Sequence, residues 1–450
     1  QNSDIVTVNV GGKLFQTTVQ TLSLAGSHSI LSTISGSNDP FFIDRDPEIF
    51  SILLSLLRTG NLASRAKQLF DVQDLIFESR FYGIENLLID SLANPSQFDA
   101  FNLKNSMILP LNGRDSPTAM CCTTRYGGGG GGGLHVSHGS KITSFDWSLS
   151  RKSTILTEFI AIDSLFALSP AAAAAGAVDF PGLQILDLEK GFIRDTLHWE
   201  NVTKTGSTVQ AIGASPDHLF TSFESSRRNS NCIMVYDLNN NLNPVSMIGH
   251  YEIYGADLIS GLPSTKLEWI SSRNLLMASG SHSSHSGVSG RIQFWDIRSS
   301  NVVLEIKEKE DCFADVTASD VLSAMFKVGV NSGDVYFSDL RRLDVDESWV
   351  RLGEGKKAAA ANGKKEGAQC RIRSHGNHAF CSRDSNVEVW SEVMMSSSRK
   401  DEPENSSTKR IFRKNTAARD EGSRNRVSNF IFGGGKMFMT RKDEQCVEVW

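Results

Sequence analysis

The feature that most constrains the fold is an ordered series of three segments within residues 5–89. They read IVTVNVGGKLFQTT, FFIDRDPEIFSILLSLLRTG and FESRFYGIENLL. The first segment opens with a β-rich run of Ile and Val, and Gly11-Gly12 supplies a tight turn after it. Leu14-Phe15 then starts a returning strand. These residues predict a β-hairpin at the start of the chain.

The second segment predicts a helix. Asp46 is placed to cap the free N–H groups of a helix, and Pro47 suits the first helical position, where a missing N–H costs nothing. Gly60 lies where the helix would stop, and Asp71 and Gly83 bound a second helix in the same way. The apolar residues between Pro47 and Gly60 recur at helical spacing: Phe50, Leu53, Leu54 and Leu57. Together the segments predict an α+β unit of about ninety residues with one core.

The order of the motifs VNVGG, F-x-TT, TL, FIDRDP, LLRTG and FYGI resembles the BTB/POZ domain of the potassium-channel-tetramerisation type, over residues 4–90. The resemblance implies a domain that forms rings of four or five subunits. In soluble members it also implies docking on the type 3 cullin scaffold of a ubiquitin ligase. By the same resemblance, Asp44, Arg45 and Asp46 lie at the subunit contact, with Asn9 and Gly11 in the neighbouring strand motif.

Two of these residues also have a simpler interpretation. Asp46 taken alone is better explained as a plain helix cap, and Arg45 as a surface ion pair that contributes little to stability. Some channel members of the family carry a zinc-binding cluster after the FYG motif, but residues 85–90 here read ENLLID. No metal or other cofactor is therefore expected. No run of eighteen apolar residues occurs, so no membrane span and no channel role are expected either.

Composition bounds the remaining possibilities. The chain has 450 residues, 40% apolar and 22% charged, which indicates a globular protein of two or three domains. A net charge of −5 over this length gives no general attraction to nucleic acid or anionic membranes. The seven cysteines form no CxxC pair and have no regular spacing. This usage favours reduced, structural thiols in a cytoplasmic or nuclear protein.

Beyond about residue 92 the chain repeats one short strand that carries Asp or Trp near its end. A spacing of about 40 to 60 residues is typical of four-stranded propeller blades. The seven instances are Ile142–Trp147, Leu183–Leu188, Ile233–Leu238, Ile292–Ile297, Val335–Leu340, Val387–Trp390 and Val447–Trp450. We therefore expect a BTB-type domain at 1–93, a linker at 94–112 and an all-β, seven-bladed propeller at 113–450.

The best-formed unit, Ser246–Ser299, resembles a WD repeat, because it opens on Gly-His and closes on RIQFWDIR. In that family a hydrogen-bond network joins a histidine, a strand serine, a turn aspartate and a tryptophan. The resemblance places His250, Ser279 and Trp295 in this network. The aspartate has no match, because its turn is replaced by the insertion at 282–290. The whole chain resembles plant BTB/POZ proteins with degenerate WD-repeat-like tails.

Several low-complexity stretches are expected to be mobile blade insertions. They are Gly127–Gly133, Ala171–Ala175, Gly353–Gly367 and Ser396–Arg426. Lysine pairs between Lys356 and Lys365 raise the possibility of nucleic-acid binding, but no aromatic residue accompanies them, so a solvated loop is favoured.

The chain contains no P-loop, GxSxG, HExxH or Cys/His cluster, so no enzymatic activity is expected. The pairs His135/His138 and His282/His285 would suit a metal only on a helix, and both lie among Gly and Ser residues. The domain combination predicts a substrate adaptor for a type 3 cullin ubiquitin ligase, in which the BTB domain oligomerises and docks the cullin while the propeller binds a protein substrate. The alternative is an oligomeric scaffold for signalling or transcriptional partners that binds no cullin.

Overall fold

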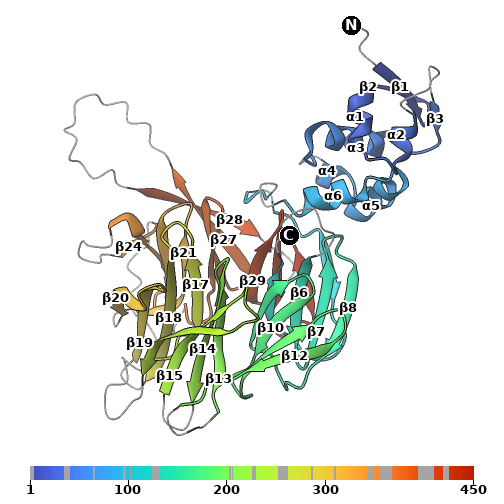
Figure 1. The fold of residues 1–450 in the computed structure, drawn as a ribbon. Helices are drawn as coiled ribbons and strands as arrows, with labels where there is room; N and C mark the ends of the chain where they lie inside the picture. The colour runs from blue at the N-terminus through green and yellow to red at the C-terminus, as the bar shows by residue number, and fades with distance from the viewer. Residues whose placement is uncertain are drawn as a thin grey trace, which may run out of the picture.

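The computed structural model contains a small α+β domain followed by a large ring of β-sheets (Figure 1). Across the described residues no helix is long and apolar enough to span a bilayer. The structure describes residues 5–34, 41–63, 66–94, 98–101, 103–123, 132–201, 204, 206–225, 230–251, 262–284, 287–308, 311–342, 349–353, 367–393, 410–418 and 425–450.

The N-terminal domain has a three-stranded sheet of order β2-β1-β3 covered by helices. Strand β1 pairs with β2 in the predicted antiparallel hairpin and with β3 in parallel. The strands are β1 (Ile5–Val10), β2 (Lys13–Thr18) and β3 (Phe41–Ile43). The helices are α1 (Val19–Ser23), α2 (Ile30–Ile34), α3 (Pro47–Thr59), α4 (Ala66–Leu69), α5 (Val72–Phe81) and α6 (Glu85–Leu92).

The predicted helix signals in this domain are confirmed. Asp46 caps α3 and Gly60 ends it in the left-handed conformation, with φ +71°. The Asp71 side chain caps α5 by accepting from the Gln73 N–H. The apolar side of α3 is buried together with Val8 and Val10 of β1 in a single core. The domain therefore has one core, built from residues close in sequence.

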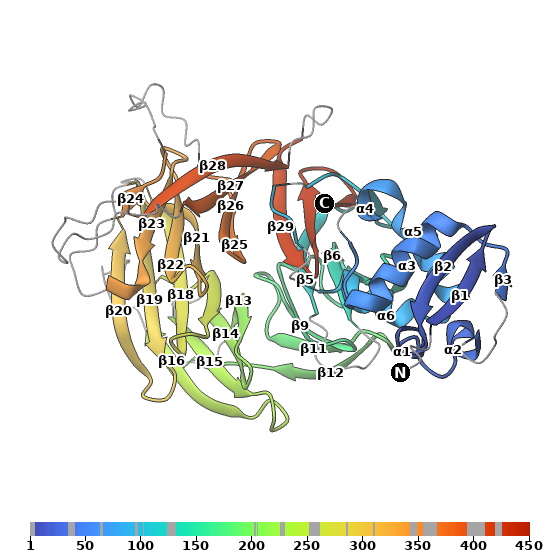
Figure 2. The ribbon, with the colours of Figure 1, turned by 90° about the horizontal axis from the view of Figure 1, so that it is seen from above.

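The rest of the chain forms seven four-stranded antiparallel sheets, as predicted, arranged as blades around a central channel (Figure 2). Blade 1 contains β5 (Pro117–Cys122), β6 (Gly133–His138), β7 (Lys141–Asp146) and β8 (Arg151–Leu156). Blade 2 contains β9 (Ser164–Ser169), β10 (Ala172–Gly176), β11 (Leu183–Asp187) and β12 (Phe192–Leu197). Blade 3 contains β13 (Thr208–Ala214), β14 (His218–Ser225), β15 (Ser230–Asp237) and β16 (Pro244–Tyr251).

Blade 4 contains β17 (Lys266–Ile270), β18 (Leu275–Ser284), β19 (Gly287–Asp296) and β20 (Asn301–Glu308). Blade 5 contains β21 (Phe313–Ser319), β22 (Ala324–Gly329), β23 (Val335–Asp339) and β24 (Val350–Arg351). Blade 6 contains β25 (Ile372–His375), β26 (His378–Arg383), β27 (Asn386–Val393) and β28 (Ile411–Ala418). Blade 7 contains β29 (Val427–Gly433), β30 (Lys436–Arg441), β31 (Cys446–Val449) and, from the other end of the propeller sequence, β4 (Met107–Pro110).

Each predicted repeat strand is the third strand of a blade. In this position a strand is hydrogen-bonded on both sides and packed between neighbouring blades, so its inward residues must be apolar. The apolar clusters follow the same rule, because each of the seven joins two adjacent blades. The blades therefore share their cores around the ring.

Strand β4 corrects the predicted boundary between linker and propeller. Residues 107–110 fall in the range expected to be a linker, yet Leu109 pairs with Val447 and completes blade 7. Upstream of β4, Phe98, Ala100 and Leu103 also pack against the propeller. An outer strand has no strong pattern of its own, so only its pairing partner identifies it. The ring is closed by residues more than three hundred positions apart.

Two segments expected to be mobile insertions form strands instead. Ala172–Gly176 is β10, and its alanines alternate between the core shared with blade 1 and the core shared with blade 3. Space is too limited there for larger residues: a Cβ at Gly176 would lie 2.5 Å from Val209 Cβ. Tertiary packing thus overrides the low strand propensity of alanine. Residues 411–418, within the second segment, form β28. Most of the poly-Gly run and the stretch with the lysine pairs lie outside the described residues.

The N-terminal domain is attached to one face of the propeller, beside blades 7 and 1 (Figures 1 and 2). Ile89 and Ala93 pack into the apolar cluster that joins these two blades. The Gly435 N–H donates to the Leu92 carbonyl over 3.2 Å, and Gln73 Nε2 donates to the Ser148 carbonyl over 2.8 Å. Gly435 and Ser148 lie in the loops that follow first and third strands, so both belong to the same face of the ring.

Candidate functional site

Gly11 brings the hairpin turn of the N-terminal domain against the charged motif. Its φ of +56° is a left-handed value that favours glycine, and a Cβ there would lie 2.6 Å from the Arg45 carbonyl oxygen. The Gly11 N–H donates to the Ile43 carbonyl over 2.9 Å. The VNVGG and FIDRDP motifs are therefore in direct contact, and Gly11 is required by their close approach.

Asp46 has the role that its simpler interpretation predicts. Its Oδ1 accepts hydrogen bonds from the N–H groups of Glu48, at 2.7 Å, and Ile49, at 3.2 Å, at the start of α3. Asp44, two residues earlier, is exposed. A contact of Asp44 or Asp46 with a second subunit stays a prediction.

Arg45 is more than a surface ion pair. Its Nη1 lies 3.3 Å from Glu78 Oε1, and the Glu78 side chain is largely buried. The guanidinium also lies over the Phe81 ring, 4.1 Å from its centroid, and near Phe77. Arg45 therefore joins the FIDRDP motif to α5, while the Phe77 side chain beside it is 61% exposed.

The outward face of the sheet is apolar around Asn9. Asn9 pairs with Leu14 on one side and with Phe42 on the other, so the three side chains form a row across the sheet. Leu14 is 62% exposed and Phe42 is 58% exposed. Asn9 Oδ1 is buried without a hydrogen-bond partner in the described part of the chain. An exposed apolar row beside the edge strand β3 is typical of a protein-binding surface. We call this row, Leu14–Asn9–Phe42, the outer sheet face.

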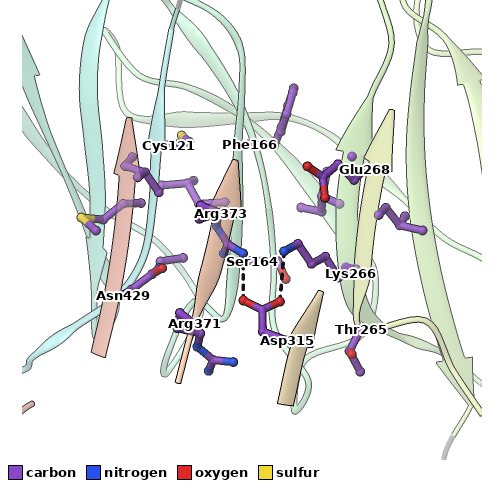
Figure 3. Close-up of a pocket in the computed structure, with 18 of the residues that line it drawn as sticks. Cys121, Ser164, Phe166, Thr265, Lys266, Glu268, Asp315, Arg371, Arg373 and Asn429 are labelled. Carbon is purple, nitrogen blue, oxygen red and sulfur yellow. Dashed lines mark hydrogen bonds and ion pairs between the residues drawn. The ribbon is translucent and has the colours of Figure 1, made fainter. Parts of the chain in front are cut away.

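The second candidate site is the channel of the propeller, where the first strands of all seven blades enclose a cavity of about 720 Å³. Three charged side chains from different blades meet there: Lys266 of β17, Asp315 of β21 and Arg373 of β25 (Figure 3). Asp315 Oδ1 lies 3.0 Å from Lys266 Nζ, and its Oδ2 lies 3.1 Å from Arg373 Nη1. We call these three residues the channel triad.

Electrostatics keep Asp315 ionised although it is buried. Burial alone would raise the pKa of its carboxyl group, but the charges of Lys266, Arg373 and Arg371 together outweigh burial and lower that pKa. Burial also lowers the pKa of the Lys266 ammonium, with a further contribution from Arg373. That ammonium donates to Asp315 Oδ1 and to the Val316 carbonyl, which holds it in the charged form.

The predicted WD-type network is not completed at its tryptophan in the described residues. The unit predicted at 246–299 is divided between two blades, with His250 exposed at the end of β16 in blade 3 and Ser279 and Trp295 in blade 4. The Trp295 indole N–H has no hydrogen-bond partner within the described ranges. The expected bond to the indole is therefore missing. The insertion at 282–290 instead lengthens the β18–β19 hairpin, where His282 pairs with Ser289.

Both members of the first histidine pair are hydrogen-bonded to side chains of their own blade. His135 Nδ1 shares a 2.8 Å hydrogen bond with Ser144, and His138 Nε2 shares one of 2.8 Å with Thr143, both within blade 1. His285 lies outside the described residues. No cluster of three potential metal ligands occurs in the part of the chain that the structure describes.

Sequence reasoning misses the channel triad. Lys266 and Asp315 are 49 residues apart, and Asp315 and Arg373 are 58 apart, so no local motif connects them. The available signal is the polar residue near the start of each first strand, which becomes informative only once the first strands are identified.

Comparisons with known proteins agree with this architecture. Residues 6–92 match the BTB/POZ domain model, and residues 119–450 match a model described as the At2g24240-like, C-terminal beta propeller. The BTB/POZ domain-containing protein At5g41330 of Arabidopsis thaliana is 58% identical over all of this chain and 96% of its own length. At4g30940 of the same plant is 26% identical over all of this chain and 98% of its own length.

More distant similarities cover one domain each. The SH3KBP1-binding protein 1 of Mus musculus is 35% identical over 92 residues, which are 19% of this chain and 13% of that protein. A chain in the crystal structure of a mitotic checkpoint complex matches with a TM-score of 0.50 and 13% identity, over 78% of this chain and 92% of that one. The latter similarity concerns the fold alone.

Proposed function

The chain belongs to the family of BTB/POZ proteins with an At2g24240-like C-terminal propeller, and from this premise we propose that it is a substrate-recognition adaptor of a type 3 cullin ubiquitin ligase. A BTB/POZ domain joined to a propeller is the architecture of an adaptor or a scaffold. In the proposed adaptor, the BTB domain oligomerises and docks the cullin, and the propeller binds the substrate. The adaptor supplies proximity and performs no chemistry itself.

The observation that supports this role is the separation of two surfaces suited to binding. The outer sheet face lies at the end of the BTB domain away from the propeller, because α6 and the start of α5 make the contact with the ring (Figure 1). The propeller face opposite that contact is left clear of the BTB domain. A chain with two such surfaces can hold two proteins at a set distance.

Oligomerisation would strengthen weak substrate binding. Several propellers on one BTB ring convert later contacts with the same substrate into intramolecular events, which raises the effective concentration. The packed junction of α6 with blades 7 and 1 would keep these propellers in a defined orientation. Both effects favour the transfer of ubiquitin from a ligase subunit to a substrate lysine.

A scaffold without a cullin is the second candidate, and the same two surfaces favour it. In that case the BTB ring would only gather copies of the chain, and the propellers would hold signalling or transcriptional partners. The two candidates differ in one respect, namely whether an oligomer of the chain binds the type 3 cullin.

The test is binding of the full chain to the purified N-terminal domain of the type 3 cullin, with light scattering on the same sample. An oligomer that binds the cullin is the expected result. An oligomer that does not bind it would exclude the adaptor and leave the scaffold. A monomer that binds no cullin would contradict both candidates.

A matched pair of variants locates the subunit contact. Phe42→Glu places a charge on the outer sheet face and should reduce the number of subunits measured by light scattering. Ile160→Glu is the control, because Ile160 is equally apolar and 82% exposed but lies on the propeller. Equal loss of oligomer in both variants would argue against the outer sheet face as the contact.

We further propose that the protein acts in the cytoplasm or the nucleus, where ubiquitin ligases of this class work. All seven cysteines are free thiols, which suits a reducing compartment. A fluorescent fusion of the full chain that accumulated in the secretory pathway would contradict this proposal.

A further inference from the structure

The channel cavity lies toward the propeller face that the BTB domain does not touch. Its charged lining comes from the beginning of first strands: Lys266 opens β17, and Arg371 immediately precedes β25. The BTB domain instead contacts loops at the ends of first and third strands, such as Gly435 after β29. A small molecule can therefore reach the charged end of the cavity without displacing the BTB domain.

Two arginines point into this end of the cavity. Arg371 and Arg373 flank Ile372, whose side chain is fully buried in the core between blades 5 and 6. Because successive side chains of a strand point to opposite sides, both arginines face the channel. Arg371 is exposed, and the Arg373 side chain is 29% exposed. Solvent or a ligand thus has access to both guanidinium groups.

The carboxylate of the triad is already satisfied. Asp315 Oδ1 accepts from Lys266 Nζ at 3.0 Å and from the Val316 N–H at 2.9 Å. Its Oδ2 accepts from the Ile372 N–H at 3.0 Å and from Arg373 Nη1 at 3.1 Å. Four donors on one carboxylate leave it no capacity to bind Arg371 as well.

Positive charge therefore remains at this end of the cavity. Lys266, Arg371 and Arg373 lie around the single carboxylate of Asp315, and the charge of Glu268 also acts on Lys266. Within the described residues no hydrogen bond or ion pair involves the Arg371 guanidinium, which lies on the Arg373 side of Asp315 (Figure 3). Arg373 uses only Nη1 toward Asp315, so its remaining N–H groups can donate to another anion.

The other acids that line the cavity are bonded elsewhere. Glu268 accepts from the Thr317 hydroxyl at 2.9 Å and from the Ala318 N–H at 3.3 Å, and it lies at the opposite end of the view in Figure 3. Asp163 accepts from the Val178 N–H at 2.9 Å. Neither acid is bonded to Arg371 or Arg373, so these two guanidinium groups can donate to an added anion.

The rest of the lining combines hydroxyl, amide and apolar side chains. Phe166, Trp269 and Phe432 contribute aromatic side chains, and Cys121 contributes a thiol. A cavity of about 720 Å³ with aromatic side chains in its wall and converging polar groups has the dimensions of a small-molecule site. Such a lining favours a ligand with a charged group at one end and a carbon skeleton at the other.

We propose that the channel binds a small organic phosphate, with the phosphate held by Arg371 and Arg373 and the organic part against the aromatic side chains. Guanidinium groups bind phosphate oxygens in a bidentate way, and the Arg371 guanidinium has no bonded acid in the described residues. This inference goes beyond the proposed adaptor function and does not depend on it. A phosphorylated peptide that used the same arginines is an alternative that the test separates.

The experiment is titration calorimetry of the full chain at low salt with phenyl phosphate, inorganic phosphate and benzoate as probes. Phenyl phosphate should bind once per chain and more tightly than either other probe, because only it has both the dianion and the ring. Its affinity should fall as salt is raised. Absence of saturable phenyl phosphate binding, or several equivalent sites per chain, would overturn the proposal.

Variants identify the site. Arg371→Ala should weaken phenyl phosphate binding roughly tenfold to a hundredfold, the usual effect of losing charged hydrogen bonds. Arg371→Lys should bind with intermediate affinity, because it keeps the charge without the bidentate geometry. The control is Arg413→Ala, which removes an exposed arginine from outer strand β28 and should leave binding unchanged. Equal weakening by the control, or wild-type affinity in Arg371→Ala, would refute the site.

Two further measurements keep the result interpretable. The melting temperature of Arg371→Ala should equal that of the wild type, because this side chain makes no hydrogen bond in the described residues. If the melting temperature falls, the affinity of Arg371→Lys for phenyl phosphate decides whether Arg371 belongs to the site. A phosphotyrosine peptide serves as the competing probe, since it shares the phenyl phosphate group. Peptide binding much tighter than that of phenyl phosphate would replace the small-molecule proposal with a peptide site.

Discussion

The charged motif of the BTB domain and the channel triad of the propeller are built in opposite ways. Asp44, Arg45 and Asp46 are adjacent in sequence and lie near the surface, and Asp46 accepts hydrogen bonds from N–H groups two and three residues away. The triad comes from three blades, and the Asp315 side chain at its centre is only 8% exposed. The comparison teaches that a local charged motif can be read from sequence, whereas a buried charge cluster depends on how the ring is closed.

The cores of the two domains differ in the same way. The BTB domain has a single core, while every apolar cluster of the propeller is shared between two neighbouring blades. Loss of one blade contact therefore weakens the whole ring. The BTB domain should be affected by a propeller variant only through the junction at α6.

The largest expected effect comes from breaking ring closure with Leu109→Asp. Leu109 is 3% exposed in β4, and an aspartate there loses apolar burial and places an unpaired charge in the core. The cost should exceed roughly 5 kcal/mol, which is comparable with the whole stability of a typical domain. Denaturant unfolding followed by tryptophan fluorescence should show loss of the propeller transition.

Ile108→Asp is the control for ring closure, since Ile108 is the preceding residue of β4 and is 57% exposed. It should unfold at nearly the wild-type denaturant concentration. Light scattering should show that Leu109→Asp still oligomerises through its BTB domain. If the propeller of Leu109→Asp unfolded at the same denaturant concentration as the wild type, the proposal that β4 closes the ring of blades would be contradicted.

The second prediction concerns the channel triad. Asp315→Asn keeps the shape of the side chain but leaves Lys266 without its buried counter-ion, so about 3–5 kcal/mol of unfolding free energy should be lost. The double variant Lys266→Met/Asp315→Leu should lose less, because the more buried charge of Lys266 is removed as well and only the more exposed Arg373 is left without its partner. Chemical denaturation of the three proteins measures both effects. A double variant less stable than Asp315→Asn would show that the triad contributes more than charge balance.

The same residue gives a pH dependence. The folded-state pKa of Asp315 is lowered, so its contribution is complete above the ordinary carboxyl pKa and is lost as pH falls from there toward the folded value. The difference in stability between wild type and Asp315→Asn should shrink below about pH 4. A difference that stayed constant from pH 7 to pH 3 would show that ionisation of Asp315 is not its source.

The third prediction lies at the junction of linker and propeller. The His375 ring stacks on Phe432 with centroids 4.6 Å apart and meets the edge of Phe98 from the linker. Burial, with a smaller contribution from His378, lowers the pKa of His375 to about 4. Between about pH 6.5 and 4, the unfolded chain therefore binds a proton at this histidine that the folded chain does not bind. Acidification over this range destabilises the folded state.

Between pH 6.5 and 5 this histidine should account for at most about 2 kcal/mol of lost unfolding free energy. His375→Gln should remove that part of the pH dependence in thermal or denaturant unfolding. The slope of stability against pH should stay unchanged in His282→Gln, since His282 lies at the far end of the β18–β19 hairpin. An unchanged slope in His375→Gln would exclude the junction histidine as the source.

The smallest effect is expected in the BTB motif. Asp46→Ala removes the α3 cap and should lower stability by about 1 kcal/mol, whereas Asp46→Asn retains an acceptor and should lose only a fraction of that. Denaturant unfolding measures both, and light scattering gives the subunit number. If Asp46→Asn were stable but monomeric, the charge of Asp46 would serve a subunit contact in addition to the cap.

Much of the BTB domain could be predicted because its signals are local. The Gly11-Gly12 turn, the Asp46 cap and the stop at Gly60 each act through dihedral angles and hydrogen bonds within a few residues. The propeller and its seven third strands could also be predicted, because a strand paired on both sides carries a strong apolar pattern. For the WD-type network at His250, Ser279 and Trp295, the sequence carries the residue types, but the Trp295 indole N–H has no hydrogen-bond partner in the described residues.

The sequence by itself determined the BTB hairpin and capped helices, the number of blades and the role of Asp46 as the cap of α3. Only the tertiary structure decided that β4 closes blade 7, that Ala172–Gly176 is a buried strand, and that Lys266, Asp315, Arg371 and Arg373 meet in one channel. The physical reason is distance along the chain. Capping and turn formation are complete within one helical turn, whereas strand pairing, tight packing and charge clustering depend on neighbours that ring closure brings from tens to hundreds of residues away.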